Sequence, residues 1–415
     1  MHRLVESVVP ARMGGRFRWL LASSWVSNIG DGLAVAAGPL LVKSQTDQPF
    51  LVAAATLLQY LPWLLFGLSA GVLADRLDRR RLVILGNLAR VVVLAVLSVT
   101  IVTDSVSIAV VLAAMFLLGT AETVVDTTTS TLLPMIVEPA DLGVANSRLM
   151  FGSITLNRLA GPPIGAALFA LGMAWPFVTQ AVCVLLAAVL VGRVALTHVP
   201  PTEAHAPVRS DIADGVRWLW GHPPIRTLAL TVVTFNVTFG AASSVLVLYA
   251  SERLRLGNVG FGLLTTVGAI GGVIGTAVYG WLERRIGLAN IMRAGLVIET
   301  TTHVTLALTR TPAVAMGIFL LFGVHEAAWG TTSTTIRQRA VPDEFQGRVG
   351  SVYMTGLVGG LVVGAGFGGV IASVWGITGP FWFAFVGSAI ILVLIWRQLG
   401  HLVHTEPEPA ATGPA

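Results

Sequence analysis

Nine ionisable side chains lie inside long apolar stretches of this sequence, and their types would allow proton exchange, ion pairing or recognition of a charged solute. They are Asp31, Arg90, Glu122, Asp126, Arg158, Glu299, His303, His325 and Glu326. An ionisable side chain near the centre of a bilayer costs roughly 2.5–3.5 kcal/mol on insertion scales, so by default such a residue marks a functional site.

The depth of these side chains follows from the rise of an α-helix, about 1.5 Å per residue. Asp31 and Glu122 then lie on the order of 20 Å deep, whereas Arg90, Asp126 and Arg158 lie about 13–17 Å deep. Glu122 and Asp126 are four residues apart and share one helix face. Because Asp126 lies at the level of Arg158, we predict that these two form a structural or gating charge pair.

The composition determines which elements must position these residues. The chain has 415 residues, of which 54% are hydrophobic and only 11% charged, and its mean hydropathy is +0.80. Soluble proteins are about 25% charged, so lipid must replace water around much of this chain. The net charge of +5 comes from short basic clusters between apolar runs, which does not predict a nucleic-acid partner. The single cysteine, Cys183, excludes an intrachain disulfide, and we expect no metal site and no cofactor.

Twelve apolar runs are long enough to cross a bilayer. They fall near 17–42, 50–74, 82–103, 107–135, 148–170, 176–197, 226–250, 259–282, 288–309, 312–335, 349–373 and 379–399. We therefore expect an all-α polytopic membrane protein with a six-helix bundle over 1–197 and a second over 226–400. Residues 198–225 would form a cytoplasmic linker with an amphipathic helix, and 401–415 a disordered tail.

The distribution of basic residues predicts the orientation. With the N-terminus inside, the inner segments hold 20 of the 26 basic residues and the outer loops hold four. This positive-inside bias predicts that both termini are cytoplasmic. An abundance of Ala, Gly, Val and Arg, with one Lys, favours a bacterial source and hence the inner membrane.

Two halves of the sequence repeat each other. Glu122 and the Thr-rich run after it match Glu326 and its own Thr-rich run at a shift of 204 residues. Glycines four residues apart occur in spans 2, 5, 8 and 11, including Gly161 and Gly165 in span 5 and a stripe of Gly356, Gly360, Gly364 and Gly368 in span 11. Such spacing lets helix backbones approach closely in lipid, so we expect these four spans to pack the halves together. A glycine-rich composition is the alternative explanation.

Residues 71–81 read Gly-Val-Leu-Ala-Asp-Arg-Leu-Asp-Arg-Arg-Arg, which resembles the loop 2–3 signature of the major facilitator superfamily. The sequence departs from that signature at Asp78, where many members have glycine. The resemblance implies a cytoplasmic latch that includes Gly71, Asp75, Arg76 and Arg80, in which Asp75 caps the positive end of span 11 near Arg348. The alternative is a basic loop that serves topology alone.

Residues 157–166 read Asn-Arg-Leu-Ala-Gly-Pro-Pro-Ile-Gly-Ala and are similar to the span 5 signature of proton-coupled exporters in that superfamily. Gly161, Pro162 and Gly165 match it, whereas Asn157 and Ala166 replace two glycines. Residues 341–351 also resemble the loop 10–11 segment of exporters of macrolides and of the siderophore enterobactin.

The resemblance implies that spans 1, 4, 7 and 10 line a central cavity, which would gather Asp31, Glu122 and Glu326. A carboxylate buried without a partner can exchange a proton near neutral pH, so these three are predicted to couple protons or bind substrate. Alternatively, neighbouring Thr and Asn side chains satisfy them. Spans 3 and 9 are peripheral in this fold, so we expect Arg90 and Glu299 to pack or pair within their own halves. His303, one turn from Glu299, is its predicted hydrogen-bond partner, and His325 could tune the adjacent Glu326. The Thr-rich runs 127–131 and 331–335 could bond either substrate or their own helix carbonyls.

The predicted function is therefore secondary transport and not enzymatic catalysis: a monomer that exports a moderately hydrophobic small organic molecule, such as a drug, antibiotic, siderophore or secondary metabolite, in exchange for protons. A proton-coupled uptake symporter on the same fold is the first alternative, and a membrane-embedded enzyme is a distant one.

Overall fold

A computed structural model describes residues 13–138, 141–194, 208–396 and 398, and these residues contain helices and no strand. The all-α prediction is confirmed. The first half consists of α2 (Gly14–Gln45), α3 (Pro49–Arg76), α4 (Arg79–Val102), α5 (Ile108–Ile136), α6 (Leu142–Gly152), the π-helix η3 (Ser153–Ala160), α7 (Gly161–Leu171) and α8 (Trp175–Val191). The predicted disordered tail, 401–415, lies outside the described residues.

The second half begins with a helix that covers the predicted amphipathic segment. Its elements are α9 (Val208–Gly221), α10 (Pro223–Ser244), α11 (Leu246–Leu248), the π-helix η4 (Tyr249–Arg253), α12 (Asn258–Leu308), α13 (Pro312–Ala340), the short 3₁₀ turn η5 (Asp343–Phe345), α14 (Gln346–Trp375) and α15 (Gly379–Ile395).

Eight of the described helices are long and apolar enough to cross a membrane, and α8 and α15 are shorter apolar helices. One of the eight, α12, has 51 residues and is interrupted at Gly287, whose φ of 75° lies in the left-handed region that favours glycine. The count of twelve spans remains a prediction. On α4, one lipid-facing stripe exposes Leu85, Val92, Val96 and Val99, which are spaced as one face of a helix.

Helix starts are set by local chemistry. Proline occupies the first turn of α3, α8, α10, α13 and α15, where its missing N–H would have no partner in any case. Asp78 precedes α4 and its carboxylate accepts a hydrogen bond from the Arg81 N–H at 2.9 Å. This N-cap is a structural reason for the acid at the position where the loop departs from the superfamily signature.

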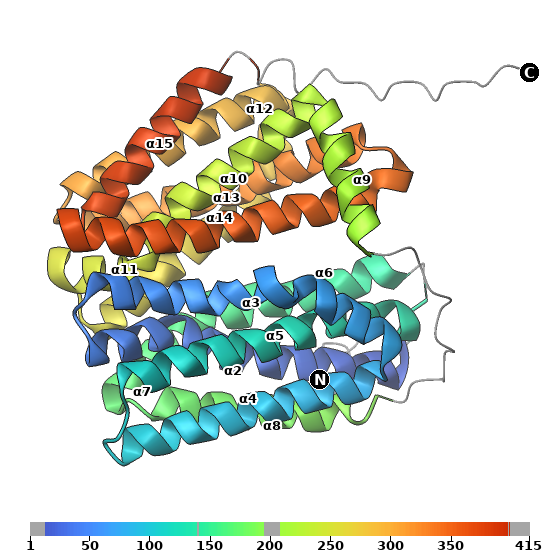
Figure 1. The fold of residues 1–415 in the computed structure, drawn as a ribbon, viewed down its shortest axis with the longest axis vertical. Helices are drawn as coiled ribbons and strands as arrows, with labels where there is room; N and C mark the ends of the chain where they lie inside the picture. The colour runs from blue at the N-terminus through green and yellow to red at the C-terminus, as the bar shows by residue number, and fades with distance from the viewer. Residues whose placement is uncertain (1–12, 139–140, 195–207, 397, 399–415) are drawn as a thin grey trace, which may run out of the picture.

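The helices form two bundles, with those coloured blue to green below and those coloured yellow to red above (Figure 1). The bundles meet where α3 runs along α14 and where α7 contacts α12. Helix α9 lies at one end of the second bundle, where Gly215 would bring a Cβ within 2.8 Å of the Arg348 carbonyl oxygen. The residue boundaries of the two domains remain a prediction.

The predicted role of the glycine stripe in span 11 is wrong in its direction. A Cβ at Gly360, Gly364 or Gly368 would lie 2.2–2.7 Å from a carbonyl oxygen of α10, which belongs to the same bundle. The face of α14 that meets α3 instead carries Gly359, Gly366 and Gly369. The helices that join the bundles are among those predicted. The spacing of small residues alone does not show which neighbouring helix a glycine stripe faces.

The buried core reveals an asymmetry along the bundle axis. At the end opposite α9, one cluster combines residues from both halves, such as Leu41, Ala53, Tyr249 and Phe261. At the α9 end, the described residues form two separate clusters, one within 13–194 and the other within 219–395. The halves therefore share a buried apolar core at one end only.

Candidate functional site

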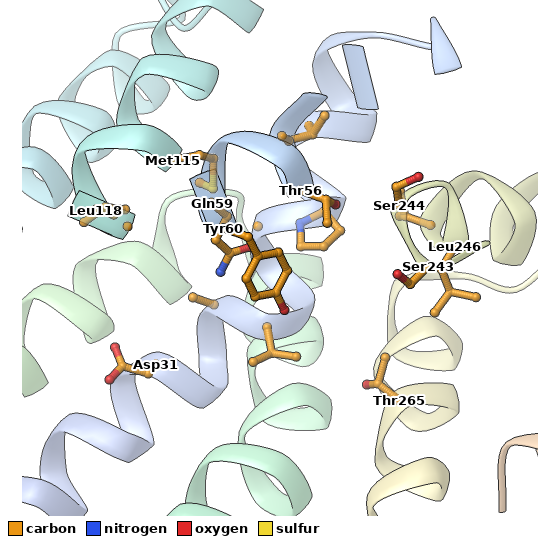
Figure 2. Close-up of a pocket in the computed structure, with 18 of the residues that line it drawn as sticks. Asp31, Thr56, Gln59, Tyr60, Met115, Leu118, Ser243, Ser244, Leu246 and Thr265 are labelled. Atoms are coloured by element: carbon orange, nitrogen blue, oxygen red, sulfur yellow. The ribbon is translucent and has the colours of Figure 1, made fainter. Parts of the chain in front are cut away.

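A cavity of about 380 Å³ lies between the two bundles. The first bundle contributes Asp31, Thr56, Gln59, Tyr60, Trp63, Arg90, Glu122, Asn157 and Gln180, and the second contributes Phe239, Ser243, Ser244, Leu246 and Thr265 among others. In Figure 2 the Tyr60 ring lies in the space between Asp31 and the helices that carry Ser243 and Thr265. A solute in this cavity would touch both halves, which is what alternating access requires.

Asp31 is the most heavily bonded acid of the cavity. Its carboxylate forms an ion pair with Arg90 and accepts hydrogen bonds from Ser27 Oγ at 3.1 Å and Gln180 Nε2 at 3.4 Å. The expectation that Asp31 has no basic partner is wrong, because Arg90 reaches it from α4, a helix that sequence reasoning treated as peripheral. The expectation that Arg90 pairs within its own half is confirmed.

Glu122 is the acid without a partner. It projects from α5 into the cavity and makes no hydrogen bond or ion pair with any residue in the described part of the chain. Arg90 and Asp31, which line the same cavity, compensate each other's charge. The cavity therefore offers one carboxylate that is free to bind a proton or a cationic solute.

Glu326 is separated from the other two acids. It lies exposed on α13 and is not among the residues that line this cavity. No ion pair within 4.0 Å joins its carboxylate to Arg158 of the first bundle in the described structure. The prediction of one site that gathers Asp31, Glu122 and Glu326 thus holds for the first two residues only.

Asp126 and Arg158 are not brought together as an ion pair in this conformation; both side chains are exposed. Arg158 belongs to the π-helix η3, which ends immediately before Pro162 and Pro163. These prolines remove two backbone donors, so the preceding carbonyls lose their helical partners and the helix widens. Sequence spacing on an ideal α-helix could not foresee this widened segment.

The exporter-like segment 157–166 packs closely within the first bundle. A Cβ at Gly161 would lie 2.4 Å from the Gly32 backbone, and one at Gly165 would lie 2.1 Å from the Leu33 carbonyl oxygen. Across the bundle interface, a Cβ at Gly262 of α12 would lie 2.8 Å from the Pro162 carbonyl oxygen. These glycines let α2, α7 and α12 approach at one place.

The Asp75 side chain of the predicted latch lies outside the described residues, so the latch remains a prediction. Around it, Gly71 has open space, Arg76 is exposed and Arg80 is half-buried. Arg348, the predicted neighbour of Asp75, lies 4.0 Å from an oxygen of Asp214 on α9.

Glu299 lies in a second buried cluster, away from the cavity acids. His303 Nε2 is 3.0 Å from Glu299 Oε1, which confirms the predicted partner. His325 Nε2 is 3.1 Å from Glu299 Oε2, so this ring bonds Glu299 and does not serve Glu326 as one interpretation of the sequence suggested. None of the described residues forms a cluster able to hold a metal ion.

Sequence reasoning missed the polar lining from α3 and α8. Gln59, Tyr60 and Gln180 all line the cavity, and Gln180 is 4% exposed. An isolated Gln in an otherwise apolar span was the available signal. For the Thr-rich runs, the sequence left two roles possible, hydrogen bonds to substrate or to the carbonyls of their own helix. In the structure Thr128 and Thr332 donate to carbonyls of their own helices at 2.6 and 2.8 Å.

Comparisons with known proteins agree with this architecture. The sequence pattern of the family described as transmembrane secretion effector matches residues 7–410. The chain is 24% identical to the multidrug efflux pump Tap of Mycolicibacterium fortuitum over 85% of this chain and 87% of Tap. It is 25% identical to the enterobactin exporter EntS of Escherichia coli K12 over 95% of both chains.

Solved structures match the fold. A bacterial homologue of the iron transporter ferroportin, in an inward-facing state, aligns with a TM-score of 0.73 and 17% identity over 92% of this chain and 98% of that chain. The nucleoside transporter NupG aligns with a TM-score of 0.76 and 10% identity over 93% of this chain and all of that chain. The protein is therefore a multi-pass membrane transporter that belongs to the transmembrane secretion effector family of the major facilitator superfamily, and not an enzyme.

Proposed function

We propose that this protein exports a moderately hydrophobic small organic molecule across a bacterial inner membrane in exchange for protons. It would act as a monomer with both termini in the cytoplasm. The observation that carries the proposal is Glu122, a carboxylate without a partner in a cavity that both bundles line.

The lining of the cavity supports the substrate class. Aromatic and apolar side chains such as Trp63, Met115 and Phe239 alternate with Gln59, Tyr60 and Ser243. A volume of about 380 Å³ falls in the range of small-molecule sites. Export of drugs and of a siderophore by the relatives Tap and EntS supports the same class and direction.

The charges of the cavity support exchange with protons. Glu122 in its ionised form favours a solute with a positive or hydrogen-bond-donating group, and its protonation removes that attraction. Proton and solute therefore compete for one carboxylate, and such competition couples two opposite fluxes. Asp31 keeps its charge compensated by Arg90 and would orient the solute through its exposed face.

Closure at the α9 end would complete the transport cycle. With the α9 end in the cytoplasm the conformation would be inward-facing, because the halves share no buried core at that end, whereas one shared core joins them at the opposite end. We propose that Asp126, Arg158, Glu326 and the segment 71–81 approach one another when the α9 end closes, and that Asp126 and Arg158 then pair as a gate.

Transport into inside-out membrane vesicles tests this function. With ethidium as a cationic probe, and enterobactin and a macrolide as further probes, an imposed gradient that is acidic inside the vesicle should drive accumulation. Collapse of the gradient should abolish it. Accumulation of these probes in right-side-out vesicles under an inward proton gradient would instead establish the uptake symporter, and failure with every probe in both orientations would contradict the proposed substrate class.

A further inference from the structure

The cluster of Glu299, His303 and His325 is not used by the function proposed above. It joins the part of α12 that follows Gly287 to α13. All three residues are at most 8% exposed. Glu299 lies nine residues from the end of α12, about 14 Å along the helix, so the cluster lies well inside the bilayer. A buried ionisable cluster at this depth requires a physical reason.

Its hydrogen bonds leave two sites for a proton. Each imidazole directs Nε2 at one carboxylate oxygen of Glu299, and both Nδ1 atoms are buried without a hydrogen-bond partner. A neutral histidine that donates through Nε2 keeps Nδ1 as a bare acceptor. Either ring can therefore accept one proton without breaking its bond to the carboxylate.

The net charge of the cluster depends on that proton. With both rings neutral, an ionised Glu299 leaves one uncompensated negative charge in an apolar interior, which is costly. One added proton makes the cluster neutral as a carboxylate and one imidazolium. Of the elements packed around it, α15 and residues 227–244 of α10 contain no ionisable residue, and Glu326 is the nearest one on α13. The cations at the two ends of this part of α12, Arg293 and Arg253, donate to backbone carbonyls and not to Glu299.

The matching position in the first bundle is occupied by a pair whose charges do not depend on a histidine. Arg90 and Glu299 correspond at a shift of 209 residues, and Arg90 pairs with Asp31 on a cavity-lining helix. Glu299 likewise bonds His325 on α13. Each bundle thus has a buried charged contact between a peripheral helix and a helix near the cavity, but only the second bundle builds this contact with histidines.

A small side cavity lies between the cluster and the central cavity. His303 lines this space of about 60 Å³, and Phe239, Ser243 and Leu246 line both it and the central cavity. The rings of Phe239 and Phe322 stack at 5.6 Å beside it. Movement of α10 relative to α13 would separate these rings and give His303 access to the central cavity.

We propose that Glu299, His303 and His325 form a second proton-binding site, in the second bundle, which takes up and releases one proton through His303 or His325. The step is a simple transfer, in which a proton from the aqueous phase binds Nδ1 of one ring and no other bond is broken. Its use in coupling rests on the proposed function, whereas the binding of the proton does not.

A proton count on the purified full-length protein in lipid nanodiscs tests the site without any substrate. The variant Glu299→Gln/His303→Gln/His325→Gln removes both ring bases together with the carboxylate, which would otherwise take up the proton itself once no imidazolium can compensate its charge. Between about pH 5.5 and pH 8.5 it should bind about one proton fewer than the wild type. His222→Gln, outside the spans, provides the matched control for loss of a histidine. An uptake equal to that of the wild type would overturn the proposal.

A second measurement covers the case in which the triple variant does not fold. Ring nitrogen NMR signals of ¹⁵N-histidine wild-type protein, assigned with the single variants His303→Gln and His325→Gln, should show one of the two rings changing protonation across the same pH range. Two rings that remain unchanged would leave the cluster a structural contact only. Because neither measurement involves transport, loss of proton-driven export in vesicles would contradict the proposed function and not this site.

Discussion

Arg90 on α4 forms an ion pair with Asp31 on α2, and the Arg90 side chain is only 2% exposed. The pair joins a helix at the edge of the first bundle to one that lines the central cavity. Removal of one partner of such an ion pair leaves the other charge without compensation, so the pair is costly to break.

The first prediction concerns this pair. Arg90→Gln should destabilise the protein by about 1–3 kcal/mol, because it leaves Asp31 as a half-buried carboxylate without a countercharge. The double variant Arg90→Gln/Asp31→Asn should recover part of that loss. Unfolding monitored by tryptophan fluorescence in detergent measures both effects, and a double variant no more stable than Arg90→Gln would show that the pair does not act as a unit.

The second prediction concerns coupling at Glu122. Glu122→Gln mimics a permanently protonated acid, so efflux driven by a proton gradient should fail while downhill exchange of the same probe partly survives. Asp31→Asn and Glu326→Gln serve as comparison variants, since Asp31 is paired and Glu326 lies outside the cavity lining. If Glu122→Gln pumps normally against a gradient, the coupling proton binds elsewhere, and Asp126 is the next residue to replace.

The third prediction concerns the segment 71–81. Asp75→Asn should preserve membrane insertion and lower the transport rate, because it removes the charge expected at the positive end of α14. Asp78→Asn is the matched control, since asparagine retains the N-cap to the Arg81 N–H. Full transport by Asp75→Asn would reduce the segment to a topological role.

The fourth prediction concerns helix approach at the exporter-like segment. Gly165→Ala places a methyl group where the Leu33 carbonyl oxygen would be 2.1 Å away, so α2 and α7 must separate. Overpacking of this kind costs about 1–3 kcal/mol. Gly330→Ala in α13 has open space and should have little effect in the same thermal unfolding measurement. Equal stability of the two variants would mean that α2 and α7 can separate without a loss of stability.

The fifth prediction concerns orientation. In a Cys183→Ala background, a membrane-impermeant thiol reagent added to intact cells should modify Asp104→Cys but not His205→Cys. The excess of arginine on one side of the spans requires this result. Labelling of His205→Cys in intact cells would reverse the topology.

The sequence by itself determined the class of the molecule and the outline of its cavity. Low charge and long apolar runs require lipid as solvent, and the matching Glu122 and Glu326 segments reveal the duplication. Periodicity and composition are local properties, so they could be read from the sequence of residues alone. The bond between His303 and Glu299 was likewise foreseeable, because residues one turn apart on a helix are neighbours.

Only the tertiary structure decided which charges meet. Arg90 reaches Asp31 over 59 residues of chain, and His325 turns to Glu299 although Glu326 is adjacent in sequence. Arg158 lies in a π-helix and not in an ideal α-helix, and the glycine stripe of α14 packs on α10 within its own bundle. A side chain's partner depends on the rotation and tilt of whole helices, which the packing of every neighbouring helix sets together, and no spacing within one segment contains that information.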